Sequence, residues 1–448
     1  MGVVIETHFW EPSISFYLFL FAACFSSILF RSHFENSTRS NPVIDSTPAS
    51  FFRFQRRFLF VYAICSVVGG LHSVFGEVEF SFYGFNREQM VTALAIGCVA
   101  ALFAGTFLGV FSDFIGHNKT CVLFCLLHLF AGILKSFTRH PSIIIPNVCL
   151  AIASSIFGFS FESWMVVEHE KLGYRQDLLV DSFWLMTFSE SASLIGSQAL
   201  ANLLVTRDSQ KGVAFPSFVA AILAIVCVIY VSRWWSGIVP ASSISNYKMV
   251  FSACILRDKR IWLLCWAQAC LEFSVKIFWI FWAPMIVADG REIHLSLIYP
   301  CLLGAKMLGS TACPWFLNGP LWTTVEDLLA AAFTTASLAL FVIAHDYQEI
   351  KFLVAVFCIF LACVGLISPS LARMRTMLVP NELRAGMMSL SSVPANAALL
   401  LVLIQNGRHR NLSNSSIMAV SALGLSTAAI CIYLLKRWTK QHQEWHKL

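Results

Sequence analysis

The sequence predicts an all-α membrane protein, and three observations carry that prediction. Thirteen apolar stretches, each about 20 residues long, are separated by shorter polar segments. A helix of about 20 apolar residues matches the hydrocarbon thickness of a bilayer. Hydrophobic residues make up 57% of the chain and charged residues only 12%, with a mean hydropathy of +0.71. Because a soluble domain carries roughly 25% charged residues, the expected surroundings of this chain are the lipid bilayer.

The first apolar stretch, residues 13–30, is predicted to be an extra membrane-spanning helix. No basic segment precedes it and no small-residue cleavage site follows it, which distinguishes it from a signal peptide. Arg31 comes directly after it, so the positive-inside rule places its amino end outside. A linker rich in Ser, Asn, Thr and Pro follows. We therefore predict an N-terminal anchor helix and linker at residues 1–50.

Twelve further stretches form two groups of six. They begin near Phe58, Gln89, Thr120, Ser142, Val180, Val213, Ile261, His294, Trp322, Ile350, Ala385 and Ser413. The longest interval between them separates the sixth from the seventh. The prediction is an N-terminal six-helix bundle at residues 51–235, a cytoplasmic linker at 236–258, and a C-terminal six-helix bundle with a cytoplasmic tail at 259–448.

The distribution of basic residues sets the topology. Alternate loops carry about twenty Lys and Arg residues against nine in the opposite loops, and the positive-inside rule makes the richer side cytoplasmic. The net charge is +6, but no dense Lys/Arg run indicates a nucleic-acid partner. The interpretation is a multi-pass membrane protein, with the plasma membrane favoured over an endomembrane and the oligomeric state left open.

The loop after the second of the twelve helices has a pattern that suits a gate. It begins at Gly109, contains Asp113, and ends in Gly116, His117 and Lys119. Gly116 permits a tight turn and Gly109 permits close approach of two helices. Asp113 can lie against a helix amino terminus, whose N–H groups and macrodipole favour an anion. We predict that these five residues latch the two halves in one state.

This loop resembles the Gly-x-x-x-Asp-x-x-Gly-Arg-x-Lys loop of the major facilitator superfamily, with His117 in place of the arginine. A closer resemblance, to the molybdate-anion transporter family of that superfamily, covers nearly the whole chain. It is carried by the segments MGVVIE and WEP near the start, FRFQR at 52–56, SFESW at 160–164 with Glu168-His169, Gln268 with Glu272, FWAP at 281–284, and Pro369-Ser370 with Met374-Arg375 and Pro380. The resemblance implies two six-helix bundles plus an extra first helix, and uptake of molybdate, a tetrahedral dianion.

Three helices depart from the family's polar pattern. In the first bundle helix, Gly69 and His72 replace an Asp and a Gln, while Asn147 and Ser392 stand where the fourth and eleventh helices usually carry arginine. Arginine suits oxyanions because its planar fork donates two parallel hydrogen bonds. We therefore expect other cations to supply the positive charge.

Charged residues inside the apolar stretches are the candidates. A charge at the bilayer centre costs at least about 2.5–3.5 kcal/mol, so it normally faces a polar cavity. Glu272 and Lys276 can pair at spacing i, i+4, either as a structural pair or in a substrate site where Glu272 holds Lys276 or relays a proton. Lys306 has no partner on its own helix and can serve a cavity or contact a neighbouring helix. The candidate substrate-binding residues are Lys276, Lys306, Glu272, His72, Asn147, Glu190 and Ser392.

Two further residues are assigned to the gate. Glu162 ends the fourth helix beside Trp164, where it can be a proton site, part of the cytoplasmic gate, or an interfacial charge. Arg375, in the Met374-Arg375 segment, completes the gating set.

Enzymatic and metal chemistry are not expected. The chain has no Gly-rich phosphate loop. Its 15 cysteines are odd in number and lie mostly within apolar stretches, and no His or carboxylate completes a metal set beside Cys121 and Cys125. The sequence thus predicts a cofactor-free secondary transporter of a small inorganic anion, molybdate or a related oxyanion, working by alternating access. The alternatives are a transporter of a sugar or organic anion and a non-transporting receptor or interaction protein.

Overall fold

The computed structural model describes residues 10–38, 49–73, 86–137, 144–204, 214–234, 244–287, 293–318, 324–345, 349–409 and 413–445. In these ranges the secondary structure is helical, apart from one isolated parallel bridge between Trp10 and Ile293. The all-α prediction is confirmed. The described residues contain 11 helices that are long and apolar enough to cross a membrane.

The first half of the chain supplies six long helical segments, and five of them are among these 11. The second of them is a single rod, because α4 continues through a π-helical turn at Ala101–Gly105 directly into α5. The helices are α2 (Ala49–Ser73), α4 (Arg87–Ala100), α5 (Thr106–Ile115), α6 (His117–Phe137), α7 (Ile144–Lys171), α8 (Asp177–Leu204) and α9 (Ala214–Trp234). Helix α8 has 28 residues and is long enough to span, but its serines and Glu190 make it less apolar than the others.

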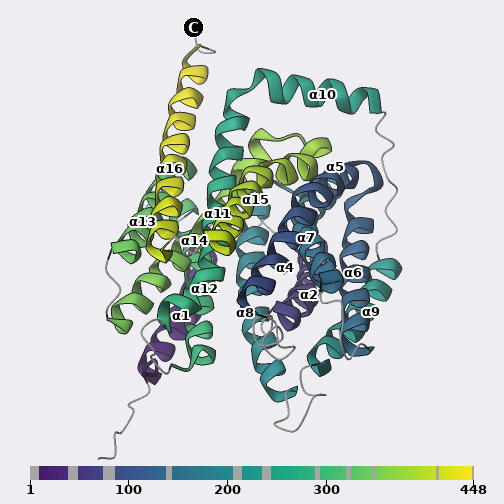
Figure 1. Cartoon of the computed structure of the whole chain (residues 1–448). Helices are drawn as coiled ribbons and strands as arrows, with labels where there is room; N and C mark the ends of the chain where they lie inside the picture. The colour runs from purple at the N-terminus through teal and green to yellow at the C-terminus, as the bar shows by residue number, and fades with distance from the viewer. Residues whose placement is uncertain are drawn as a thin grey trace, which may run out of the picture.

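The second half supplies six more segments. A single 3-10 turn at Asn381–Leu383 leads into α15. The helices are α11 (Lys259–Ile286), α12 (Leu295–Asn318), α13 (Val325–His345), α14 (Ile350–Leu378), α15 (Arg384–His409) and α16 (Asn414–Trp445). Figure 1 shows the two groups side by side, blue and teal helices against green and yellow ones. With α1 (Ile14–Thr38), all thirteen predicted stretches are helices.

The two groups have separate apolar cores. Phe58, Ile156 and Met165 belong to a cluster built mainly by α2, α6, α7, α8 and α9. Phe278 and Phe357 belong to a cluster built mainly by α11 to α16. Between the groups, α8 packs against α12 and α14, while α4 and α5 pack against α15. These contacts bring polar residues from both halves to one interface.

The predicted linker contains a helix that the sequence does not predict. Helix α10 (Ile244–Arg257) places Tyr247 in a small apolar cluster with Val379, Leu383 and Met387. Figure 1 shows α10 and the carboxyl end of α16 at the same end of the molecule. The boundary predicted at residues 235 and 236 lies outside the described residues.

Helix α1 packs on the second half of the molecule, although the chain joins it to the first. Leu20 is buried in the core cluster of the second half. Ser27 Oγ accepts a hydrogen bond from Trp315 Nε1 at 2.9 Å, and Cys24 Sγ contacts the Gly304 carbonyl at 3.8 Å. The extra helix is therefore a partner of α12 (Figure 1).

Candidate functional site

A cavity of about 500 Å³ lies between the two halves. Its walls come from α2, α4, α7 and α8 on one side and from α11, α12, α14 and α15 on the other. Among the described residues that line it, the acids are Glu162, Glu190 and Glu272 and the bases are Lys276, Lys306 and Arg375. The formal charges of this lining therefore cancel when all six groups are ionised.

The cavity brings together six of the seven predicted substrate-binding residues and two of the predicted gating residues. The six are Lys276, Lys306, Glu272, Asn147, Glu190 and Ser392, and the two are Glu162 and Arg375. They come from six different helices of both halves. No short stretch of the chain could show this convergence, because it depends on how the two halves pack.

His72, the seventh predicted substrate-binding residue, is not part of the cavity lining in the described structure. It is 5% exposed and faces α6, with Nδ1 3.3 Å from His128 Nδ1 and 3.1 Å from the Val68 carbonyl oxygen. The prediction that His72 belongs to the substrate site rests only on its replacing a polar residue of the family pattern. The observed geometry does not support that placement, since α2 turns this side chain into its own half.

Lys306 and Glu190 form an ion pair across the two halves. Lys306 Nζ on α12 lies 3.2 Å from Glu190 Oε2 on α8, and the side chains are 14% and 27% exposed. The sequence left Lys306 without a partner on its own helix, and the structure supplies one from the other half. The pair lies in the cavity wall. Lys306 is therefore both a cavity residue and a contact to a neighbouring helix, the two alternatives that the sequence left open.

Lys276 has two partners in the second half. Its Nζ lies 3.6 Å from Glu272 Oε2, one turn earlier on α11, and donates to Asn396 Oδ1 on α15 at 2.7 Å. Asn396 was not identified from the sequence. It follows Ser392 by one helical turn, so the i, i+4 spacing on α15 was the signal that could have found it.

Arg375 joins the halves through a bidentate pair. Its Nε and Nη2 donate to the two carboxylate oxygens of Glu162 at 2.8 and 2.5 Å, and Nη1 donates to Gln268 Oε1 at 2.6 Å. Gln268 Nε2 in turn donates to Glu272 Oε1 at 2.9 Å. A continuous polar chain thus runs from Glu162 through Arg375, Gln268 and Glu272 to Lys276.

The remaining two cavity candidates are already engaged by the protein. Asn147 Nδ2 donates to the Ala93 carbonyl oxygen at 2.6 Å, tying α7 to α4. Ser392 Oγ donates to the Met388 carbonyl oxygen one turn earlier at 3.2 Å. Each keeps acceptor oxygens for a ligand.

Asp113 occupies the amino terminus of a helix from the opposite half. Its carboxylate oxygens accept the backbone N–H groups of Ala385 at 3.1 Å and Gly386 at 2.8 Å, in the first turn of α15. Tyr247 Oη of α10 donates to the same carboxylate at 3.4 Å. Burial and the nearby Asp113 carboxylate raise the pKa of Tyr247 well above its ordinary value, so this phenol stays a donor at physiological pH.

Two glycines make this approach possible. A Cβ at Gly109 would lie 2.1 Å from Ser389 Oγ, and a Cβ at Gly386 would lie 2.9 Å from Asp113 Oδ2. Both distances are far shorter than van der Waals contact. The close packing of α5 on α15 therefore requires residues without a side chain at these positions.

The other members of the loop have local roles. Gly116 has φ of 103°, which favours glycine, and forms the turn between α5 and α6. His117 folds back so that Nδ1 lies 3.0 Å from Ser112 Oγ, while Lys119 is exposed. Among these five residues, Asp113 and Gly109 thus contact the opposite half directly, and Gly116 shapes the loop that carries them.

Three cysteines of the first half also converge, away from the cavity. In the described part of the chain, Cys65, Cys125 and Cys227 form a group with the spacing of metal ligands. The sequence offers only Cys121 and Cys125 on one helix as a pair; it does not reveal this group, because the three members come from α2, α6 and α9.

Comparisons with known proteins agree with this architecture. Residues 16–345 match a family described as sugar transporters with 12 transmembrane segments. The molybdate-anion transporter of Xenopus tropicalis is 26% identical over 428 residues, covering 92% of this chain and 91% of the relative. That of Danio rerio is 24% identical over 386 residues, covering 79% of each.

Solved structures show the same fold at low identity. A bacterial homologue of the iron transporter ferroportin, in an outward-facing state, superposes with a TM-score of 0.67 at 13% identity, covering 86% of this chain and 99% of the other. The major facilitator superfamily transporter FucP, in its outward conformation, gives 0.65 at 11% identity, covering 85% and 98%. The predicted major facilitator superfamily fold is therefore confirmed.

Proposed function

The chain belongs to the family described as sugar transporters with 12 transmembrane segments, and we propose that it carries an oxyanion, molybdate or a close relative, by alternating access. It is a multi-pass membrane transporter and not an enzyme. Its extra first helix and two six-helix units are proposed to divide at residues 1–50, 51–235, 236–258 and 259–448. We place the transporter in the plasma membrane, with the linker and the carboxyl end in the cytoplasm.

One observation carries the choice of an anion: two lysines, from the consecutive helices α11 and α12, line the same cavity, each beside its own carboxylate. Lys276 is paired with Glu272 and Lys306 with Glu190. Paired charges cost less to bury than isolated ones, so the cavity is stable while it is empty. An entering anion can then replace each carboxylate as the partner of its lysine.

Charge balance indicates that protons accompany the anion. With all six charged lining residues ionised the net charge is zero, so a dianion alone would leave the buried cavity with a charge of −2, which is costly. If Glu190 and Glu272 each take up a proton, Lys276 and Lys306 supply two unpaired positive charges. Those two charges match a tetrahedral dianion, and we therefore propose proton-coupled uptake.

Alternation requires the contacts between the halves to break and reform. We propose that Glu162 with Arg375, and Asp113 with the amino terminus of α15, hold the end of the molecule near α10 closed. Both contacts join residues from opposite halves. Rocking of the halves about the cavity would separate them and open that end.

A neutral sugar or organic anion is the second candidate. The family is described as sugar transporters, and the cavity has zero formal charge and many hydroxyl and amide groups. A volume of about 500 Å³ can hold a small sugar as well as an oxyanion. If Glu190 and Glu272 stay ionised and paired with their lysines, the cavity keeps a net charge of zero. A neutral solute then suits the cavity better than an anion.

The test is uptake of radiolabelled molybdate by cells that lack their own molybdate uptake. Wild type should show saturable uptake that a protonophore abolishes. Lys276→Ala and Lys306→Ala should each reduce uptake at least about tenfold, because each removes a positive charge that would contact the anion, and a hydrogen bond to a charged group contributes about 1.5–3 kcal/mol. Lys351→Ala is the matched control, since Lys351 is exposed on α14 and outside the lining.

Competition separates the two candidates. Excess unlabelled sulfate should suppress the uptake of molybdate, and a mixture of neutral hexoses should leave it unchanged. Uptake no greater than in cells with an empty vector, or equal uptake by wild type and Lys306→Ala, would refute the proposed anion site. Hexose uptake that is sensitive to Asn396→Ala would support the sugar candidate.

A further inference from the structure

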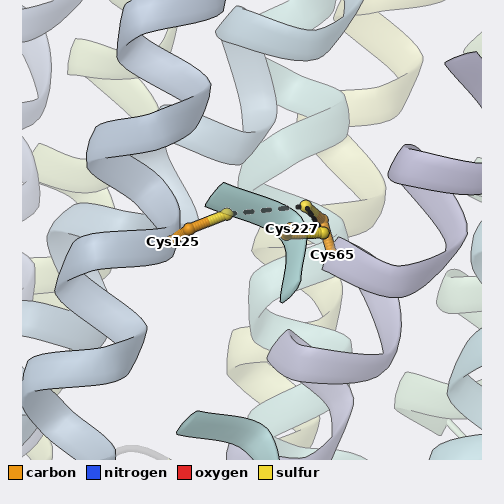
Figure 2. A group of neighbouring side chains, drawn as sticks. All are labelled: Cys65, Cys125 and Cys227. Carbon is orange, nitrogen blue, oxygen red and sulfur yellow. Dashed lines mark hydrogen bonds between the residues drawn. The ribbon is translucent and has the colours of Figure 1, made fainter. Parts of the chain in front are cut away.

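We propose that Cys65, Cys125 and Cys227 form a binding site for one thiophilic monovalent cation, Cu(I), inside the first half of the molecule. Figure 2 shows the three side chains converging from separate helices. Cys65 lies on α2, Cys125 on α6 and Cys227 on α9. The group lies outside the cavity lining, so this proposal is independent of the proposed transport function.

The sulfur atoms already have the spacing of a metal site. Cys65 Sγ lies 3.6 Å from Cys227 Sγ and 3.9 Å from Cys125 Sγ (Figure 2), and all three sulfurs lie within 4.8 Å of one another. With metal–sulfur bonds of about 2.3 Å, three sulfurs around one ion lie about 3.8–4.0 Å apart. Side-chain shifts of a few tenths of an ångström would therefore bring all three to one ion.

The surroundings of the group are apolar. The three cysteines are each at most 1% exposed and lie in a core cluster with Val61, Phe124 and Ala224. No His or carboxylate belongs to the group among the described residues. A net charge placed here would be costly unless it is compensated within the site.

These surroundings select the ion. Sulfur ligands favour Cu(I) and Zn²⁺ among biological metals, but structural zinc takes four protein ligands, and this group has three. Binding of Cu(I) can be electroneutral: one thiol gives up its proton and bonds the ion as a thiolate, while the other two coordinate through neutral sulfur. One positive charge enters and one proton leaves, no atom changes oxidation state, and no further reactant is needed. A divalent ion would have to displace two protons.

A bound ion would cross-link three helices of one half. Helices α2, α6 and α9 pack against one another around the cysteines, and the site would stiffen that half without touching its interface with the other. Because a ligand that binds only the folded state stabilises it, Cu(I) should raise the thermal unfolding temperature of the protein.

The test uses full-length protein in detergent, reduced and free of oxygen. Cu(I) is supplied as its acetonitrile complex and titrated against the chelator bicinchoninate. We expect one chelator-resistant copper per chain, sulfur as the only neighbour of copper in X-ray absorption, and a higher unfolding temperature. Zn²⁺ added at the same molar ratio should not be retained by the protein and should not raise its unfolding temperature.

Variants separate this site from the other cysteines. Cys65→Ala and Cys227→Ala should each lose the tightly held copper. Cys121→Ala, one turn before Cys125, and Cys313→Ala, in the second half, should keep it; both of these cysteines are buried. Chelator-resistant copper that persists in a Cys65, Cys125 and Cys227 triple variant would overturn the proposal. Failure of wild type to retain any copper would overturn it as well, whatever the variants do.

Discussion

Replacing Asp113 with Asn should loosen the closed end of the molecule. The carboxylate accepts two backbone N–H groups at 3.1 and 2.8 Å from the first turn of α15. Asn offers one neutral acceptor oxygen, so it keeps one bond, without charge assistance, and loses the attraction of the helix amino terminus. Hydrogen bonds to charged groups contribute about 1.5–3 kcal/mol and a helix terminus about 0.3–1 kcal/mol, so we expect a loss of about 2 kcal/mol.

That loss translates into a measurable population shift. At 1.4 kcal/mol per factor of ten, about 2 kcal/mol changes the ratio of closed to open molecules roughly 30-fold. Spin labels at Lys119 and Glu382 report the separation of the halves, because both positions are exposed. Lys119 lies in the first turn of α6, just after the loop that follows Asp113, and Glu382 lies in the 3-10 turn that leads into α15. In lipid nanodiscs, Asp113→Asn should add a population at longer distances.

The control for this experiment is Asp177→Asn. Asp177 is 57% exposed and pairs with its neighbour Arg175 at 2.8 Å, so its loss should not change the distance distribution. Identical distributions for wild type and Asp113→Asn would refute the reasoning that this carboxylate holds the two halves together.

Three more predictions follow from contacts between helices. Gly109→Ala should push α5 away from α15, since the added Cβ would lie 2.1 Å from Ser389 Oγ, at a cost of about 1–3 kcal/mol. Adding Ser389→Gly removes the two closest atoms and leaves the Ala385 carbonyl oxygen at 3.0 Å, so the spin-label distances should return most of the way to the wild-type values; no return at all would contradict the steric argument. Arg375→Lys should lower the thermal unfolding temperature, because lysine keeps the charge but cannot reproduce the bidentate bond to Glu162; an unchanged unfolding temperature would argue against a structural contribution from this pair. Trp315→Phe removes the hydrogen bond to Ser27. The backbone amides of α1 should then exchange hydrogen faster, with a free energy of protection lower by about 1 kcal/mol. Unchanged exchange would mean that apolar packing alone holds α1.

The spanning helices were predictable because their signal is local. Each needs only about 20 consecutive apolar residues. Every one of the thirteen predicted stretches is a helix, and in the described residues eleven of them are long and apolar enough to cross a membrane. Helix α10 lacks this signal, because its 14 residues are too few to span a bilayer and include several polar groups. The sequence therefore did not predict it. Length identifies a helix that crosses lipid, and it gives no information about a helix that lies across the end of a bundle.

The sequence identified most residues of the site, but it did not show which of them are partners. Lys306 and Glu190 stand out because each is a charge in an apolar stretch, but they are 116 residues apart, and only the packing of α12 on α8 makes them partners. His72 shows the converse. Its position was inferred from a family pattern, yet the rotation of α2 directs it to His128 and away from the cavity.

The contacts of α1 have a consequence for the order in which the protein assembles. Its hydrogen bonds to α12 join residues 280 to 288 positions apart. Because a chain is made from its amino end, α1 enters the membrane long before its docking surface exists, and the first six-helix unit is completed in the meantime. The last step for α1 is therefore a lateral search within the bilayer, after α12 has been inserted. The docking of α1 on α12 would then be a slow step of assembly. A substitution on the face of α12 that contacts Leu20 or Cys24 would delay this step even though the cavity itself is intact.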